Sequence, residues 1–134
     1  MRKLLTTVAL LASCLAIGTT TANAAQTRAT PLADCHVANV QLAFDNWGST
    51  GGFHAYCGQN RRVWAVTAFY DSAGAQIAGG SGYTLVPADG QWHWLYANTS
   101  WGGVWKPVYT GCIWITQDNP LPGGTLLSNY CKNK

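Results

Sequence analysis

The sequence predicts an all-β fold, a small antiparallel β-sandwich or barrel of about seven strands that is braced by disulfides. Glu is absent, and beyond the first 24 residues no long stretch has helical spacing, so little or no helix is expected in the mature domain. Val, Thr, Trp and Tyr alternate with polar residues over short runs, which is the period of a half-buried strand. Turn signals recur at intervals of roughly 8 to 12 residues, as in sandwiches and barrels.

Residues 1–24 have the composition of a bacterial-type signal peptide. Arg2 and Lys3 precede a mostly apolar run, residues 4–17, and small residues at 22–24 suit signal peptidase. The run is too short for a stable membrane span, so cleavage after Ala24 and secretion are expected. Residues 25–34 are predicted to form a flexible arm before a single β domain, residues 35–134.

A lipoprotein is the alternative form of the exported chain. Residues 11–14 resemble a lipobox, after which the chain would be cut and lipidated on Cys14. Apolar residues continue past Cys14 to Ile17, so the cysteine lies inside the hydrophobic region rather than at its end. This favours ordinary cleavage, with Cys14 discarded in the leader.

Four cysteines remain in the mature region: Cys35, Cys57, Cys112 and Cys131. An even number in an exported chain predicts disulfides, and three pairings are possible. The centre of the Pro/Gly-rich loop 118–125 is equidistant from Cys112 and Cys131, so an antiparallel hairpin would place them opposite each other. The second predicted disulfide then joins the two remaining cysteines, Cys35 and Cys57. The spacings match no zinc pattern, and neither a metal nor another cofactor is expected.

The first half of the domain predicts a hairpin and then a central strand. Residues 38–44 alternate, with apolar side chains at even positions; the glycine-rich segment 46–52 is expected to turn the chain, and 53–57 to return. Residues 63–70 are apolar on both faces, as in a strand covered on both sides. Asp71 to Gly74 is a turn signal leading to a short strand at 75–78.

The second half predicts shorter strands. Residues 82–86 form a strand that Pro87 ends, and 88–90 turn the chain into 91–97. In that strand Trp92, Trp94 and Tyr96 share one face, while His93, Leu95 and Ala97 share the other. A loop at 98–103 precedes an extended segment, 104–116, where Pro107 marks an edge or a bulge.

Tryptophan is the most unusual feature of the composition. The domain holds seven, four of them within fourteen positions, and flat aromatic side chains can stack on the apolar faces of sugar rings. Core packing and protein interfaces are the other uses of such residues. Trp47, Trp101 and Trp105 adjoin glycines in loops and are expected to be exposed. The predicted glycan-binding residues are Trp92, Trp94, Trp101, Trp105, Tyr96 and Trp47.

Other function classes have weaker support. Without residues 1–24 the chain has six Lys and Arg against five Asp, a balance that does not favour nucleic acid. A small hydrolase would need two carboxyl groups within about 10 Å, and at least three Asp lie in turn-like sequence. His36, His54 and His93 have no HExxH or HxH spacing, no GxSxG elbow occurs, and all mature cysteines are used in pairing. We therefore expect a monomeric, non-enzymatic module that binds a polysaccharide or other glycan.

A protein target is the alternative. The order of strand, aromatic turn, cysteine and a Val/Thr-rich strand ending in Tyr70-Asp71 resembles small secreted amylase inhibitors of filamentous bacteria. The Trp-Arg-Tyr triplet of those inhibitors is absent and the cysteine spacings differ, so no residue role is transferred. The resemblance implies an inhibitor that docks on a secreted or cell-surface macromolecule. A small antimicrobial toxin is the other form of this alternative, since a rigid, disulfide-braced domain lowers the ordering cost of binding.

Overall fold

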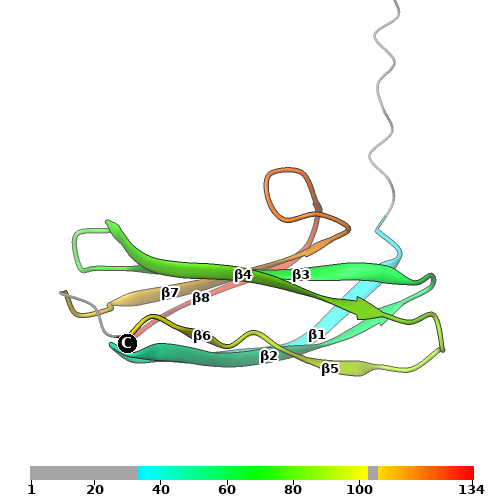
Figure 1. The fold of residues 1–134 in the computed structure, drawn as a ribbon, viewed down its shortest axis with the longest axis horizontal. Helices are drawn as coiled ribbons and strands as arrows, with labels where there is room; N and C mark the ends of the chain where they lie inside the picture. The colour runs from blue at the N-terminus through cyan, green and yellow to red at the C-terminus, as the bar shows by residue number, and fades with distance from the viewer. Residues whose placement is uncertain (1–32, 103–105) are drawn as a thin grey trace, which may run out of the picture.

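A computed structural model describes residues 33–102 and 106–134 of the chain, and its strands form two sheets packed face to face (Figure 1). The described residues contain eight strands and no helix, which confirms the all-β prediction and selects the sandwich over the barrel. The leader, most of the arm and Trp105 lie outside the described residues. No helix in the described part is long and apolar enough to cross a bilayer.

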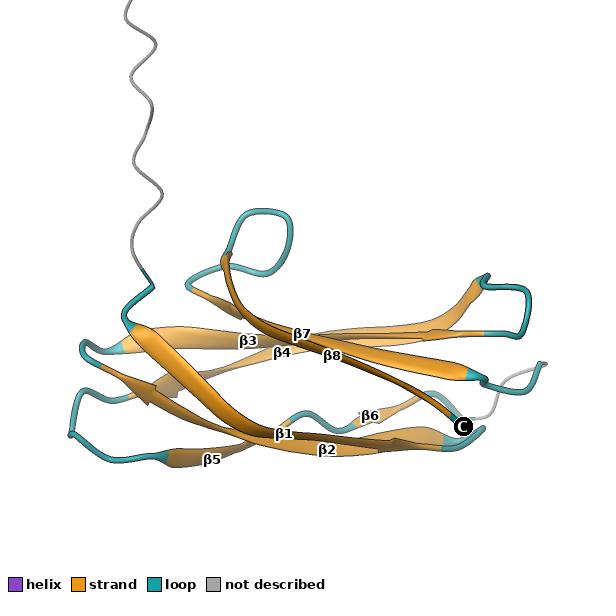
Figure 2. Cartoon of the chain, turned by 180° about the vertical axis from the view of Figure 1, so that it is seen from behind, coloured by secondary structure: helices purple, strands orange, loops and turns teal. Residues whose placement is uncertain are grey.

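Both sheets are antiparallel (Figure 2). In the first, which we call the β2 sheet, β2 has β1 on one side and the successive short strands β5 and β6 on the other. The second, the β3 sheet, has the order β4-β3-β7-β8. The strands are β1 (Cys35–Phe44), β2 (Gly48–Cys57), β3 (Arg61–Tyr70), β4 (Gln76–Val86), β5 (His93–Tyr96), β6 (Thr99–Ser100), β7 (Thr110–Gln117) and β8 (Thr125–Asn133).

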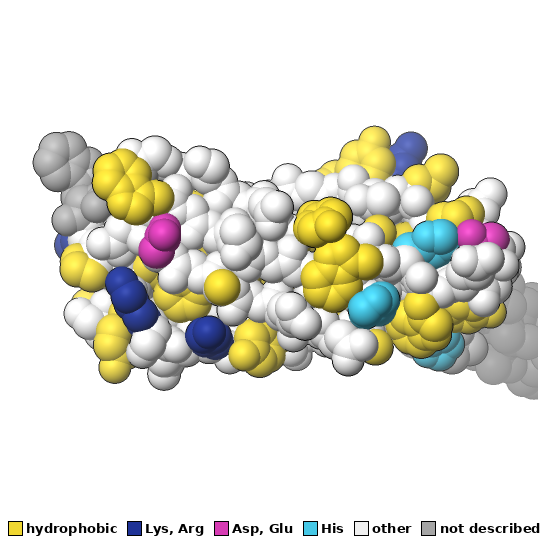
Figure 3. Space-filling view, turned by 90° about the horizontal axis from the view of Figure 1, so that it is seen from below, with side chains coloured by type: hydrophobic (Ala, Val, Ile, Leu, Met, Phe, Trp, Pro, Cys, Tyr) yellow, Lys and Arg dark blue, Asp and Glu magenta, His cyan; other side chains and the backbone are white. Residues whose placement is uncertain are grey.

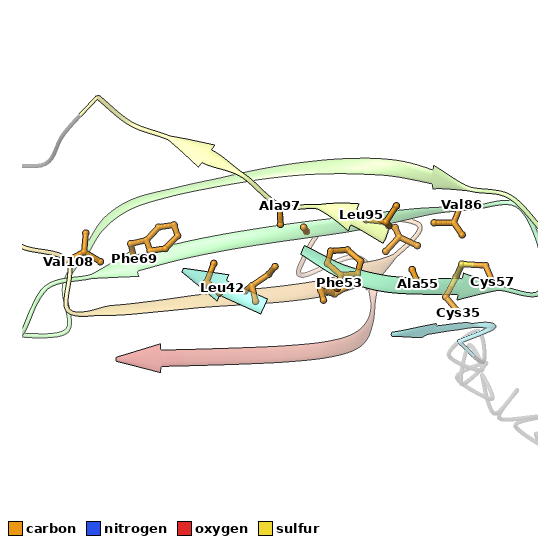
Figure 4. Close-up of a cluster of buried hydrophobic side chains, with 14 residues drawn as sticks. Cys35, Leu42, Phe53, Ala55, Cys57, Phe69, Val86, Leu95, Ala97 and Val108 are labelled. Atoms are coloured by element: carbon orange, nitrogen blue, oxygen red, sulfur yellow. A yellow bond between two sulfur atoms is a disulfide. The ribbon is translucent and has the colours of Figure 1, made fainter. Parts of the chain in front are cut away.

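The core lies between the sheets and is built by alternation along the strands (Figure 4). In β3, the central strand, Val63, Ala65, Thr67 and Phe69 point inward and are buried. On the outward face Ala68 is buried, but Trp64, Val66 and Tyr70 are only half-buried, so the expectation that both faces are covered is wrong for most of the outward face. The large outward rings of Trp64 and Tyr83 pack against each other across neighbouring strands, with centroids 4.8 Å apart.

Three boundaries differ from the sequence prediction. The two strands predicted at 75–78 and 82–86 are one strand, β4, which begins at Gln76. Its glycines let the backbone of β4 lie close to β3: a Cβ at Gly79 would be 2.6 Å from the carbonyl oxygen of Thr67. The loop at 98–103 contains β6, which pairs with β2. The segment predicted to be extended from 104 becomes a strand at Thr110.

A bulge in β1 reverses which side chains face the core. The register with β2 shifts between Ala38 and Gln41, where Asn39 has φ 53°. Asn tolerates this left-handed conformation better than most residues. Val37 therefore packs against the core before the bulge and Leu42 after it. Ala38, expected to share a face with Leu42, pairs instead with outward-facing His54.

Both predicted disulfides are confirmed. Cys35 pairs with Cys57 across β1 and β2, and Cys112 pairs with Cys131 across β7 and β8. Their sequence separations of 22 and 19 are alike, so each should restrict the unfolded chain to a similar extent. Disulfides form and persist in an oxidising compartment, which is where such a chain is expected to fold.

The two disulfides are expected to differ in their accessibility to reductant. Cys35 and Cys57 are 4% and 1% exposed, whereas Cys131 is on the surface. Thiol attack needs access to a sulfur, so mild dithiothreitol should open Cys112–Cys131 first. Alkylation of the released thiols followed by peptide mass spectrometry measures the order. Equal labelling of both pairs at every reductant concentration would contradict it.

Candidate functional site

The outer side of the β2 sheet carries a row of ring side chains, which we call the aromatic face. In the view of Figure 3, hydrophobic side chains gather at the centre and towards one end of this side, with histidines among them. Trp94 and Tyr96 come from β5, and Trp92 immediately precedes that strand. The rings of the aromatic face are His36, His54, Tyr56, Trp92, Trp94 and Tyr96.

Trp94 lies across a glycine of the neighbouring strand. A Cβ built on Gly52 would be 2.4 Å from Cζ2 and 2.7 Å from Cε2 of the indole, so the ring occupies the space that a side chain would fill. The His54 ring stands at 67° to the indole with centroids 4.9 Å apart, and the Tyr96 ring at 87° with centroids 6.2 Å apart. The indole is thereby held over Gly52 by two rings that pack against it at steep angles.

A second group of rings extends the aromatic face along β2. Trp92 lies against Tyr56 with centroids 6.0 Å apart, and His36 stacks on the same tyrosine at 6.2 Å. The turn before Trp92 is fixed by Asp89, whose Oδ1 lies 2.9 Å from His93 Nε2 and accepts the Gln91 N–H. These hydrogen bonds, the one from His93 foremost, lower the pKa of the Asp89 carboxyl.

A groove continues from this ring cluster towards the β1–β2 turn. One hollow of about 500 Å³ is lined by Gln41, Thr50, Asn98 and the rings of Trp94 and Tyr96, among others. A second, of about 580 Å³, adjoins exposed Trp47. The two hollows share Ala43, Thr50 and Asn98 as lining residues, so they adjoin each other along β2, and we refer to them together as the groove.

Small residues on β2 create this groove. The glycines that the sequence predicted as a turn lie within the strand, and the turn itself is shorter, with Asp45 Oδ1 accepting the N–H groups of Trp47 and Gly48. Outward positions 48, 50 and 52 are therefore Gly, Thr and Gly. Where β5 ends, Asn98 Oδ1 accepts the Gly51 N–H and replaces a strand partner. Because two of the three outward residues are glycine, Thr50 is the one outward side chain that β2 places along the groove.

Five of the six predicted site residues are on the aromatic face, at the far end of the groove, or outside the described residues. Trp92, Trp94 and Tyr96 lie together on the aromatic face, and Tyr96 is 74% exposed. Trp47 is 69% exposed at the far end of the groove, as expected for a loop residue. Trp105 lies outside the described residues.

Trp101 was expected to be exposed, and this expectation is wrong. Its ring packs on Phe69 with centroids 4.5 Å apart, and its indole N–H donates to the Asn46 carbonyl oxygen. The pairing of β6 with β2 directs the chain back over the open end of the sandwich, and the Trp101 N–H donates to the Trp47 carbonyl oxygen. This tryptophan closes the core instead of offering a surface.

Sequence reasoning did not select His54, Tyr56, Gln41, Thr50 or Asn98 as site residues. The first two could have been found, because they alternate with buried Phe53, Ala55 and Cys57 and must therefore face outward. The polar three could not, since they meet only through the pairing of β1 and β5 with β2.

The aspartates have structural partners. Lys106 Nζ is 2.9 Å from Asp71 Oδ2, and this ion pair, together with the Ala75 and Ala73 N–H groups, lowers the pKa of Asp71. Arg61 contacts both Asp34 and Asp118, at 3.1 and 3.3 Å, so these two carboxylates do approach each other. Neither lines the groove beside the aromatic face. Within the described ranges, no group of three or more His, Cys or Asp side chains is placed to hold a metal ion.

Comparisons with known proteins give only remote likenesses. Neither a scan of protein-family models nor a search of curated proteins finds a match. Among solved structures, a beta-glucuronidase from glycoside hydrolase family 2 is similar over 73% of this chain and 11% of its own, with 12% identity and a TM-score of 0.41. A putative beta-galactosidase from Bacteroides fragilis is similar over 72% and 15%, with 11% identity and a TM-score of 0.40. This chain thus spans a small part of either protein.

Proposed function

We propose that the protein is a secreted, non-enzymatic module that binds carbohydrate on its aromatic face. The observation that carries this proposal is the indole of Trp94, which covers Gly52 and has the rings of His54 and Tyr96 packed against it at steep angles. One side of a pyranose ring presents mostly C–H groups, and a flat aromatic surface can bury them. The site is held in place before binding, which lowers the ordering cost.

Polar groups beside the rings support a sugar ligand over a purely apolar one. Gln41, Thr50 and Asn98 line the groove next to Trp94 and can exchange hydrogen bonds with hydroxyl groups. A site that combines apolar contact with a few placed polar groups is typical of small-molecule and sugar recognition. Export would follow from the leader at residues 1–24, and the two disulfides fit an extracellular location.

Titration of tryptophan fluorescence with a panel of soluble polysaccharides tests the proposal, paired with retention on insoluble ones. Trp92 is 51% exposed on the same face as Trp94, so binding there should change the emission saturably. Retention should follow the same order of polysaccharides as the fluorescence change. An unchanged spectrum and no retention across the panel would contradict a carbohydrate ligand and favour a protein target.

A protein target is the second candidate, and the outer side of the β3 sheet favours it. Leu85 is 60% exposed there, near Tyr83 on β4, over whose ring the Arg62 guanidinium lies at 5.4 Å, and Leu126 is 50% exposed on β8 at the other edge of the sheet. Exposed aliphatic side chains beside Tyr and Arg suit a protein interface better than a sugar. Capture of a stoichiometric hydrolase or receptor complex that Leu85→Asp abolishes would support this reading, whereas a complex unaffected by that substitution would count against it.

A further inference from the structure

We infer that the ligand is a neutral, extended polysaccharide chain that lies along β2 and occupies the groove from Trp94 to Trp47. This inference rests on the proposed function and deepens it. It specifies the charge of the ligand, its minimum length and the residue that binds its far end. Four observations on the described residues carry it.

The first observation is the continuity of the groove. Its two hollows share Ala43, Thr50 and Asn98 as lining residues, so a ligand seated on the Trp94 indole can continue past Thr50 towards the β1–β2 turn. Between Gly52, which the Trp94 indole covers, and Gly48 beside Trp47, Thr50 is the one outward side chain of β2, so no large side chain of that strand stands between the two tryptophans. A straight, narrow ligand fits such a floor better than a branched or globular one.

The second observation is the length of the groove. Gly48 and Gly52 are four residues apart on an extended strand, roughly 13 Å at about 3.3 Å per residue. Trp94 lies over the second glycine, and Trp47 immediately precedes the first. This distance exceeds the span of one pyranose ring, so the two tryptophans would contact different sugar residues of the same chain.

The third observation is charge. Of the residues that line the two hollows, Asp45 is the one with a charged side chain at neutral pH, and its Oδ1 already accepts the N–H groups of Trp47 and Gly48. The lining contains no Lys, Arg or His. An anionic polymer such as a polyuronate or a nucleic acid would meet no cation there and would approach a carboxylate.

The fourth observation is the distribution of polar groups. Thr50 and Gln41 are both exposed: Thr50 lies between Gly48 and Gly52 on β2, and Gln41 lies beside Gly52 in the hollow at Trp94. Asn98 Oδ1 is held by the Gly51 N–H, which leaves the Asn98 amide N–H₂ to donate into the groove. Hydroxyl groups can both donate to and accept from these side chains, whereas an aliphatic chain cannot.

Calorimetric titration of the whole secreted protein with neutral oligosaccharides tests the inference. The probes are cello-, manno- and chito-oligosaccharides, each as disaccharide and hexasaccharide, with polygalacturonate as the anionic comparison. In at least one neutral series the hexasaccharide should bind about tenfold or more tightly than the disaccharide, because it reaches a second aromatic anchor. Trp47→Ala should bring hexasaccharide affinity down to the disaccharide level and leave disaccharide affinity unchanged.

Control variants separate the inference from the proposed function. Trp47→Phe should restore part of the hexasaccharide affinity, and Tyr109→Ala, a change at an exposed tyrosine outside the groove lining, should have no effect. Three results would overturn the inference while the proposed function stood. They are equal affinity for disaccharide and hexasaccharide, hexasaccharide affinity that Trp47→Ala leaves unchanged, and tighter binding of polygalacturonate than of the neutral probes. Absence of binding to every probe and to the polysaccharide panel would overturn both.

Discussion

Replacing Trp94 with alanine is expected to weaken carbohydrate retention by about 30-fold or more. Loss of a central aromatic anchor costs about 2 kcal/mol or more in binding, and each 1.4 kcal/mol is a factor of ten. The substitution removes the flat surface that covers Gly52 and leaves His54 and Tyr96 without the ring they flank. Depletion binding on the polysaccharide that retains the wild type best measures the change.

The fold must survive this substitution for the result to bear on binding. Trp94 is half-buried on the outer side of the sheet, so circular dichroism and the urea midpoint of the variant should stay close to those of the wild type. Trp94→Tyr keeps a flat ring and should retain much of the affinity. Tyr109→Ala removes a comparably exposed ring elsewhere and should bind normally. Normal retention by Trp94→Ala would show that the ligand does not use the aromatic face.

Local patterns were enough to predict most of the fold. The apolar run at residues 63–70 identified the central strand, because β-branched and aromatic residues on both faces are typical of a strand inside a packed sheet. Which face points inward was not predicted, since both are apolar. The register Cys112↔Cys131 followed from the length of one hairpin. Both predictions need only residues close in sequence or a single loop centre.

The site was less predictable because long-range pairing decides it. Asn39 looks like a polar position of a regular strand and the Gly48–Gly52 segment looks like a turn, but the pairing of β2 with β1, β5 and β6 places a bulge at Asn39 and makes the glycines part of β2, beside the groove. Trp101 has the glycine neighbour of an exposed loop tryptophan, yet it packs on Phe69. Whether a tryptophan beside a glycine covers the core or faces solvent depends on how the adjoining strand is paired. For Trp101 that strand is β6, which directly precedes it and pairs with β2.

Gln117 is a further case that the sequence could not predict, since it looks like the polar end of a strand. It is fully buried, and its Oε1 accepts the N–H groups of Asp34 and Cys35 at the start of β1. Its Nε2 donates to Asp118 Oδ2. A single side chain thus joins the β2 sheet to the β3 sheet next to a disulfide, through contacts more than eighty residues apart in sequence.

Phe69→Ala is expected to cause the largest loss of stability, about 3–5 kcal/mol in the free energy of unfolding. Phe69 is 0% exposed, and its ring packs between Phe44, at 5.6 Å, and Trp101, at 4.5 Å. Gly111 lies beneath the same rings, where a Cβ would come within 2.6 Å of Phe44, so neighbouring side chains cannot collapse from that side to fill the cavity. Urea unfolding followed by circular dichroism measures the effect.

Two further variants identify the cause of this loss. Phe69→Leu keeps most of the buried volume and should lose clearly less stability than Phe69→Ala, while Tyr109→Ala should change it by less than about 0.5 kcal/mol. Since Trp101 packs directly on Phe69, its fluorescence should also shift in the folded Phe69→Ala variant. A loss below about 1 kcal/mol with unchanged emission would mean that Phe69 and Trp101 do not form the closed end of the core, and the placement of β6 against β2 would then be wrong as well.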